Sequence, residues 1–182
     1  IETPLMIILA NNPLFNGIAP NVLTEDLREI SFHTRFYRKG EILAHQDDVC
    51  NRLVILIKGS VRGEMIDDSG RLIKVEDIAA PRAIAPLFLF GNENRYPVEV
   101  TANEATEVIE IPKASVLKLF RKNEKFLENY MNLSANYAHT LSDKLFFMSF
   151  KTIRQKLASY LLRLSNQQQS EHITLNRSQQ QL

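Results

Sequence analysis

Short stretches with strand character, separated by turn signals, fill residues 32–111 and constrain the fold more than any other feature. Residues 32–37 alternate with a period of two, and Arg52–Lys58 is a nearly continuous apolar run that predicts a central strand buried on both faces. A hairpin turn is predicted at residues 67–70. The other predicted strands are residues 42–44, 60–66, 72–78, 98–101 and 107–111. Such a series is typical of a β-barrel or jelly roll.

Helical patterns flank the strand region on both sides. Pro20 suits the first turn of a helix that runs to about residue 31. Pro112 ends the strand region, and the pattern then predicts a short helix over residues 113–120 and a long one, without Pro or Gly, over residues 123–148. An amphipathic helix (152–165), a polar loop (166–170) and a short strand (172–175) are predicted to follow. The predicted fold class is therefore α+β.

The long helix over residues 123–148 carries two apolar stripes, so it needs two partners. One stripe holds Leu127, Met131, Ala138, Leu141, Leu145 and Met148, and the other holds Phe126, Tyr130, Leu133 and Tyr137. The strand domain of the same chain can cover one stripe. The steps from Leu127 to Met148 fit a coiled-coil seam with a second chain, and burial of the helix in a monomer core is the alternative. We expect a homodimer whose interface contains Leu127, Met131, Leu141, Leu145 and Met148.

Composition excludes several classes of site. The 182 residues are 45% hydrophobic and 24% charged, as in ordinary globular proteins, and Cys50 is the only cysteine. A disulfide within the chain is therefore excluded, and a cysteine-bound iron–sulfur cluster or structural zinc is not expected. The apolar run at residues 5–10 lacks the basic flank of a signal peptide, and no stretch reaches the roughly 18 apolar residues of a membrane span. We expect a cytoplasmic protein without a membrane partner.

Charge is unevenly divided along the chain, although the net charge is only +1. Residues 149–182 hold five basic side chains and one acidic side chain, and the rest of the chain carries a net charge of −3. The five basic residues are Lys151, Arg154, Lys156, Arg163 and Arg177. This division favours a polyanion as the partner of the C-terminal part, with a solvated helix face as the alternative.

Several short motifs, taken in order, resemble those of one bacterial family. They are residues 12–15 (NPLF), 27–30 (LREI), 36–43 (FYRKGEIL), 53–61 (LVILIKGSV), 107–112 (EVIEIP), 149–158 (SFKTIRQKLA) and 173–182 (ITLNRSQQQL), with Leu133-Ser134 in the long helix. The chain is thereby similar to the Crp/Fnr family of transcription regulators, which join a sensor barrel of cyclic-nucleotide-binding type to a winged helix-turn-helix. The junction around residues 149–151 also resembles the HcpR branch, which regulates nitrosative-stress genes.

The resemblance implies a division into three parts. These are a sensor domain over residues 1–122, a dimerisation helix over residues 123–148, and the start of a truncated winged helix-turn-helix over residues 149–182. It also implies promoter DNA as a partner, bound through a domain beyond residue 182, with Lys151, Arg154 and Lys156 contacting the phosphate backbone. Because the base-reading residues would follow Leu182, we expect this chain by itself not to bind DNA with sequence specificity.

Residues 82–90, which we call the cassette, depart from the pattern of relatives that bind cyclic AMP. Those relatives have a Gly-Glu pair before a Leu-Phe pair and an Arg-Ser pair after it, which hold the cyclic phosphate and a ribose hydroxyl. Here the Gly and Glu positions are apolar, and Tyr96 follows Arg95. The comparison disfavours a cyclic nucleotide and implies an apolar effector pocket. Its expected lining is Ile84, Leu87, Phe88, Arg95, Tyr96, Leu141 and Leu145.

Haem is the candidate cofactor that the resemblance suggests for such a pocket, with nitric oxide as the sensed gas. Haem needs an axial ligand, and the candidates are Met148 and His139 on the long helix. The alternatives are that Met148 simply fills the helix seam and that His139 is a surface residue.

The expected function is that of the sensor and dimerisation part of a Crp/Fnr-type transcription factor, which couples an effector to promoter binding. The alternatives are a cyclic-nucleotide-binding regulatory module and a regulator with an unidentified small-molecule effector. An enzyme is not expected, because the sequence has no nucleophile–base arrangement, metal-ligand spacing or phosphate-binding loop. Asp67 and Asp68 lie in a predicted turn, where aspartate is a common residue.

Overall fold

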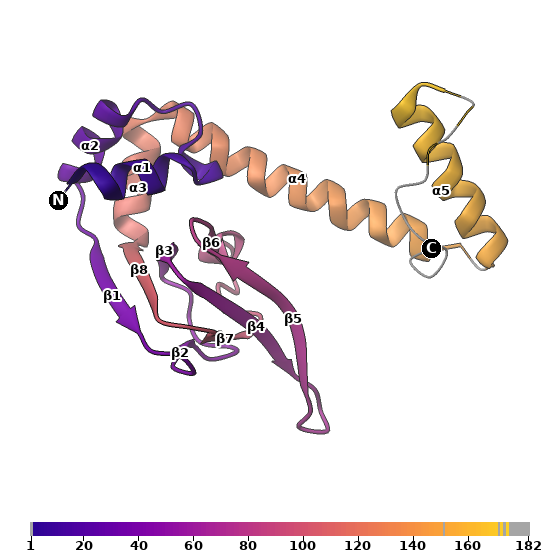
Figure 1. Cartoon of the computed structure of the whole chain (residues 1–182), viewed down its shortest axis with the longest axis horizontal. Helices are drawn as coiled ribbons and strands as arrows, with labels where there is room; N and C mark the ends of the chain where they lie inside the picture. Colours follow the sequence, from indigo (N-terminus) through magenta and orange to yellow (C-terminus); the bar gives the residue numbers. More distant parts are fainter. Residues whose placement is uncertain (1, 151, 171, 173, 175–182) are drawn as a thin grey trace. The chain divides into compact units, whose positions relative to one another are not determined.

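The computed structural model describes residues 2–150, 152–170, 172 and 174. The chain divides into two compact units, Ile1–Leu133 and Ser134–Leu182, and helix α4 (Glu124–Met148) crosses the boundary between them. Figure 1 shows the strands gathered in the first unit and α5 (Ile153–Gln168) in the second.

Two antiparallel sheets of four strands each build the first unit, within the described residues. One sheet has the strand order β1-β8-β3-β6, and the other has the order β2-β7-β4-β5. The strands are β1 (His33–Tyr37), β2 (Ile42–Ala44), β3 (Arg52–Lys58), β4 (Ser60–Ile66), β5 (Leu72–Ala79), β6 (Ala83–Ile84), β7 (Glu99–Ala102) and β8 (Thr106–Pro112). Strands distant in the sequence pair within each sheet, which confirms the predicted jelly roll.

Strand β3 lies inside its sheet, between β8 and β6. Its five middle residues, Leu53 through Ile57, are all buried. Successive side chains of a strand point to opposite faces, so five consecutive buried residues require cover on both faces. The prediction of a central, doubly buried strand is confirmed.

The turn predicted at residues 67–70 forms between β4 and β5. The Asp67 carboxylate accepts hydrogen bonds from the backbone N–H groups of Ser69 and Arg71, both at 2.9 Å. The hydrogen bond from the Ser69 side chain holds the pKa of Asp67 below its ordinary value. Asp67 therefore stabilises the turn, as expected from the sequence.

Three helices lie grouped together beside the sheets (Figure 1): α1 (Glu2–Ala10), α2 (Pro20–Arg28) and α3 (Lys113–Lys122). Helix α2 begins at Pro20 as predicted but ends at Arg28 rather than near residue 31, because the backbone must become extended for β1 at His33. Asp26 of α2 is buried and accepts a hydrogen bond of 2.7 Å from the amide of Asn123. This bond ties α2 to the junction between α3 and α4.

The first turns of α4 pack into the first unit through aromatic rings. Phe126 and Tyr130 are both buried. Phe126 stacks on Phe15 with the ring centroids 5.3 Å apart, and Tyr130 meets Phe120 edge to face at 5.1 Å. The strand domain of the same chain therefore covers the first part of the stripe that contains Phe126 and Tyr130.

The second unit holds the rest of α4 and α5. Thr152 caps α5 and forms a reciprocal pair of hydrogen bonds with Gln155, which fixes the start of the helix. Arg163 of α5 lies 3.5 Å from a carboxylate oxygen of Asp143, and its guanidinium lies over the ring of Phe146. The predicted amphipathic helix is confirmed.

The polar loop predicted at residues 166–170 is wrong over its first residues, because α5 continues to Gln168. Polar side chains cost little in an exposed last turn, and Gln169 ends the helix in the left-handed conformation with φ +47°. The described residues do not show the winged helix-turn-helix predicted for residues 149–182. The strand predicted at 172–175 and the motif at 173–182 fall mainly on residues outside the described part of the chain.

Hydropathy adds one further result. None of the helices in the described part of the chain combines the length and the apolar character needed to cross a bilayer.

Replacement of Phe126 by alanine should destabilise the first unit. Phe126 is only 1% exposed and lies between the rings of Phe15 and Phe120, so the truncation should lower the free energy of unfolding in urea by about 3–5 kcal/mol. The matched control is Phe36→Ala, because Phe36 is 73% exposed on β1, and its effect should stay within about 0.5 kcal/mol. Equal losses in the two variants would contradict the packing described.

Candidate effector site

The cassette lies at the edge of the first sheet. Strand β6 (Ala83–Ile84) pairs with β3, and a short 3-10 helix, η2 (Pro86–Leu89), follows it. Ile84 and Leu89 are buried, whereas Leu87 and Phe88 are half-buried. Three of the predicted pocket residues, Ile84, Leu87 and Phe88, therefore lie on one short apolar segment.

Ala85 links β6 to η2 in an unusual backbone conformation. Its φ is +44° and its ψ is 43°, in the left-handed region. That region costs a residue with a Cβ about 1–2 kcal/mol, so the surrounding contacts must hold the segment in place. Backbone strain of this kind is concentrated at binding sites and switch segments, which supports the cassette as a functional element.

Arg95 is engaged with the backbone outside the cassette. Its side chain is exposed, and one guanidinium nitrogen donates a hydrogen bond of 2.7 Å to the carbonyl of Asp47. Tyr96, in contrast, is buried and hydrogen-bonds Cys50. The two adjacent residues predicted for the pocket therefore have different surroundings.

Burial perturbs three weak acids near this site. Loss of hydration raises the pKa of the Cys50 thiol and of the Tyr96 and Tyr130 phenols. For Tyr96 the neighbouring Cys50 raises the pKa further. All three groups are therefore held in their protonated, neutral forms in the folded protein.

Tyr130 connects the cassette to α4. Its hydroxyl donates a hydrogen bond to the carbonyl of Pro86, the first residue of η2. Its ring also meets Phe90, the last residue of the cassette, edge to face at 5.8 Å. A hydrogen bond and a ring contact therefore join the cassette to the first turns of α4.

The sequence places Tyr130 on an apolar stripe but does not reveal this link. A tyrosine among phenylalanines in a predicted core is the one available signal, because a buried hydroxyl needs a hydrogen-bond partner. That signal does not identify Pro86 as the partner, since the two residues are 44 positions apart.

The remaining predicted pocket residues, Leu141 and Leu145, belong to the second unit, and their part in the pocket stays a prediction. Both are exposed in the single chain, as are Met131 and Met148, while Leu127 is half-buried. The predicted dimer seam is thus uncovered over most of its length. The candidate haem ligands Met148 and His139 are exposed as well.

Two of the three predicted DNA-backbone residues lie in the first turn of α5. Arg154 is exposed and Lys156 is half-buried, whereas Lys151 lies outside the described residues. A search of the described residues for three or more His, Cys, Asp or Glu side chains able to hold one metal ion gives none.

Known proteins match the chain over the sensor region. Residues 34–123 match the family described as the cyclic nucleotide-binding domain. The cyclic AMP receptor protein of Thermus thermophilus is 27% identical over 167 residues, which cover 87% of this chain and 72% of that protein. The cAMP-activated global transcriptional regulator CRP of Escherichia coli is 29% identical over 138 residues, which cover 74% of this chain and 64% of that protein.

A solved structure agrees with these matches. The crystal structure of a transcriptional regulator from Thermotoga maritima superimposes with a TM-score of 0.62 at 32% identity, and the match covers 64% of this chain and 91% of that one. Fold and sequence together define a sensor domain of cyclic-nucleotide-binding type. The chain belongs to the Crp/Fnr family of regulators. It spans 64% of the length of the Escherichia coli relative.

The buried acids of the site should make the protein sensitive to alkali. Unfolding returns Cys50 and the two tyrosines to ordinary pKa values near 9.0 and 10.0. The unfolded chain then loses protons at a lower pH than the folded chain. The stabilisation is therefore complete below pH 9 and is lost as the pH rises, by about 1.4 kcal/mol per pH unit for each ionising group.

Urea denaturation between pH 8 and pH 11 measures this loss. The double variant Cys50→Ala, Tyr96→Phe should show a shallower decline in the free energy of unfolding than the parent chain. Tyr137→Phe is the control, because it removes a tyrosine that is exposed on α4. Identical slopes in the double variant and the parent would show that burial of Cys50 and Tyr96 does not set the alkaline limit.

Proposed function

We propose that the chain is the sensor and dimerisation part of a transcription regulator in which an effector bound at the cassette repositions α4. The contact between Tyr130 and Pro86 supports this most directly, because it joins the cassette to the long helix. Such a regulator has two positions of the cassette in equilibrium, and an effector shifts that equilibrium only by binding one position more tightly than the other. The proposed coupling path is thus short: effector, η2, Tyr130 and α4.

The chemistry of the cassette favours an effector without a phosphate. A cyclic phosphate needs backbone N–H groups and a free arginine. Ala83 and Ile84 replace the glycine and glutamate of relatives that bind cyclic AMP, and one guanidinium nitrogen of Arg95 is engaged by the Asp47 carbonyl. Binding of a cyclic nucleotide, as the names of the Thermus and Escherichia coli relatives state for those proteins, is the alternative.

Haem does not fit the single chain. An axial ligand has to lie in an apolar cavity that excludes water around the iron. Met148 is 71% exposed and His139 is also exposed, so neither is enclosed by the described residues. A small apolar molecule is therefore the proposed effector class, and membership in the HcpR branch stays a prediction.

A second copy of the chain is the proposed partner of α4. The stripe from Met131 to Met148 is apolar but exposed, and three of its members, Met131, Leu145 and Met148, are each more than 60% exposed. Packing against the same stripe of a second chain would remove this apolar surface from water. Promoter DNA is proposed as the partner of the assembled regulator, on the similarity to proteins named as transcriptional regulators.

Ligand titration tests the proposed effector class. Calorimetric titration of cyclic AMP should give no saturable heat with this chain under conditions in which the Thermus thermophilus relative, as the positive control, binds. When haem is added, neither Met148→Ala nor His139→Ala should abolish an absorption band of the parent chain. Saturable binding of cyclic AMP that Arg95→Gln weakens would assign a cyclic nucleotide and contradict the proposal.

Sedimentation velocity tests the proposed dimer. Leu145→Glu should weaken self-association by about thirtyfold or more, because it places a charge within an apolar seam. The matched control is Asn136→Glu, which adds the same charge to an exposed position of α4 outside the seam, and it should leave the association constant unchanged. A parent chain that stays monomeric at every concentration measured would contradict the dimer.

A further inference from the structure

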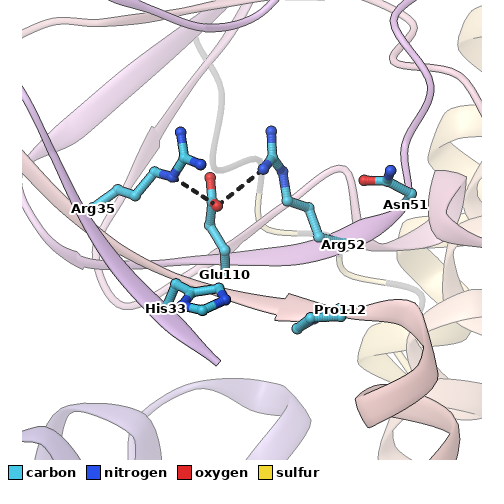
Figure 2. A pocket seen from close by; sticks show the side chains of 6 residues that line it. All are labelled: His33, Arg35, Asn51, Arg52, Glu110 and Pro112. Atoms are coloured by element: carbon cyan, nitrogen blue, oxygen red, sulfur yellow. Dashed lines mark hydrogen bonds and ion pairs between the residues drawn. The ribbon is translucent and has the colours of Figure 1, made fainter. Parts of the chain in front are cut away.

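A cavity lined by charged and polar residues lies on the sheet that contains β1, β8 and β3, and none of its lining residues belongs to the cassette. It has a volume of about 230 Å3, and Figure 2 shows its lining: His33, Arg35, Asn51, Arg52, Glu110 and Pro112. The pairing register accounts for this grouping. His33 is opposite Glu110, and Arg52 is opposite Pro112, so these side chains share one face of the sheet.

Glu110 is the buried member of the group. Its side chain is only 5% exposed, and a single carboxylate oxygen, Oε2, accepts from both arginines. Nε of Arg35 lies 3.0 Å away and Nη1 of Arg52 lies 3.1 Å away. Figure 2 shows both guanidinium groups turned toward this carboxylate. The arrangement therefore fixes the two arginines at the cavity.

The charges of this group do not balance. One arginine is enough to neutralise the Glu110 carboxylate, and the second leaves a net charge of +1 beside the cavity. Each guanidinium has five N–H donors, and within the described residues each gives one nitrogen to Glu110, while Arg35 also hydrogen-bonds Tyr37. Several guanidinium donors at the cavity are therefore unused.

The rest of the lining adds donors and no further acid. Within the described part of the chain, the side chains of His33 and Asn51 make no hydrogen bond, and both are exposed to solvent. An imidazole and a carboxamide each offer N–H groups to a ligand. The cavity thus combines a surplus positive charge with unused donors from β1, from β3 and from Asn51, which directly precedes β3.

We propose that this cavity binds a small oxyanion, a phosphate or a carboxylate, held between Arg35 and Arg52. The planar guanidinium groups suit the paired oxygens of such an anion, and Asn51 and His33 supply further donors. Glu110 acts as a positioning residue that holds the two arginines. The site goes beyond the proposed sensor function and does not depend on which effector occupies the cassette.

Titration with inorganic phosphate at constant ionic strength, followed by the amide signals of the 15N-labelled chain, tests the proposal. Saturable shifts should appear for residues of β1, β3 and β8, with a dissociation constant on the order of 1 mM or tighter. Arg35→Gln should weaken binding by about tenfold, because it removes one charge-assisted contact. Arg35→Lys, which keeps the charge, should recover part of the loss. Acetate and malonate should compete if the carboxylate is the recognised group.

Two comparisons decide between a specific site and unspecific attraction. Arg71→Gln is the matched control. Arg71 pairs with Asp67 on the exposed β4–β5 hairpin, so its replacement removes the same charge at a position far from the cavity residues in the sequence. It should leave phosphate binding unchanged. Asn51→Ala, which leaves both arginines and Glu110 intact, should weaken binding and guards against loss of folding in the arginine variants. Absence of saturable shifts, or equal weakening by Arg35→Gln and Arg71→Gln, would overturn the proposal.

Discussion

The packing of the first turns of α4 against the jelly roll is the constraint on which the rest of the architecture depends. Asn123 starts this arrangement, because its side chain accepts a hydrogen bond from the backbone N–H of Phe126 and donates one to Asp26. The helix is thereby capped and joined to α2 at the same point. Phe126 and Tyr130 then follow one turn apart and bury their rings among Phe15, Phe90 and Phe120. Among the described residues of α4, the fully buried side chains, Phe126 and Tyr130, both lie in this first part.

The same aromatic group joins three segments that are distant in the sequence. Phe120 comes from α3, Phe90 from the end of the cassette, and Tyr130 from α4. Closely packed rings do not deform freely, so a change in the position of one segment requires the others to adjust. This property makes the packing suited to the proposed transmission of a change at η2 to α4. The hydrogen bond from Tyr130 to the Pro86 carbonyl makes this contact sensitive to distance and angle, because the bond is lost when its atoms separate.

The strands were predictable because alternation and turn residues are local signals. Strand β3 is identified by five consecutive apolar residues, and the β4–β5 turn by Asp67 and Gly70. The cavity was not predictable by such signals. Glu110 alternates with Ile109 and Ile111, so its position is typical of a solvent-facing residue, yet its side chain is buried. Its partner Arg52 lies 58 positions away, and only the pairing of β3 with β8 brings the two together.

The cassette differs from the cavity, because part of its character can be predicted from the sequence. Its departure from the phosphate-binding pattern is visible in the residue types, whereas the left-handed conformation of Ala85 and the bond between Arg95 and Asp47 are products of tertiary structure. The residue types of the cassette therefore predict a class of effector, whereas the geometry of the site depends on contacts that are distant in the sequence. For the exposed seam of α4, the apolar periodicity is a local signal that the sequence reveals, whereas the proposed partner is a second chain that local sequence does not reveal.

A comparison of Asp26 with Glu110, the buried carboxylates among the described residues of the first unit, shows why the surplus charge at Glu110 is informative. Asp26 shares Lys122 with Glu29, and Lys118 donates to the Glu29 carbonyl, so two acids meet two lysines. The hydrogen bond from Lys122 lowers the pKa of Glu29, as expected for a balanced pair. Glu110 instead faces two arginines beside a cavity with no other acid in its lining. A fold that only needed to neutralise Glu110 could do so with one arginine, and the second is available to the anion that we propose for the cavity.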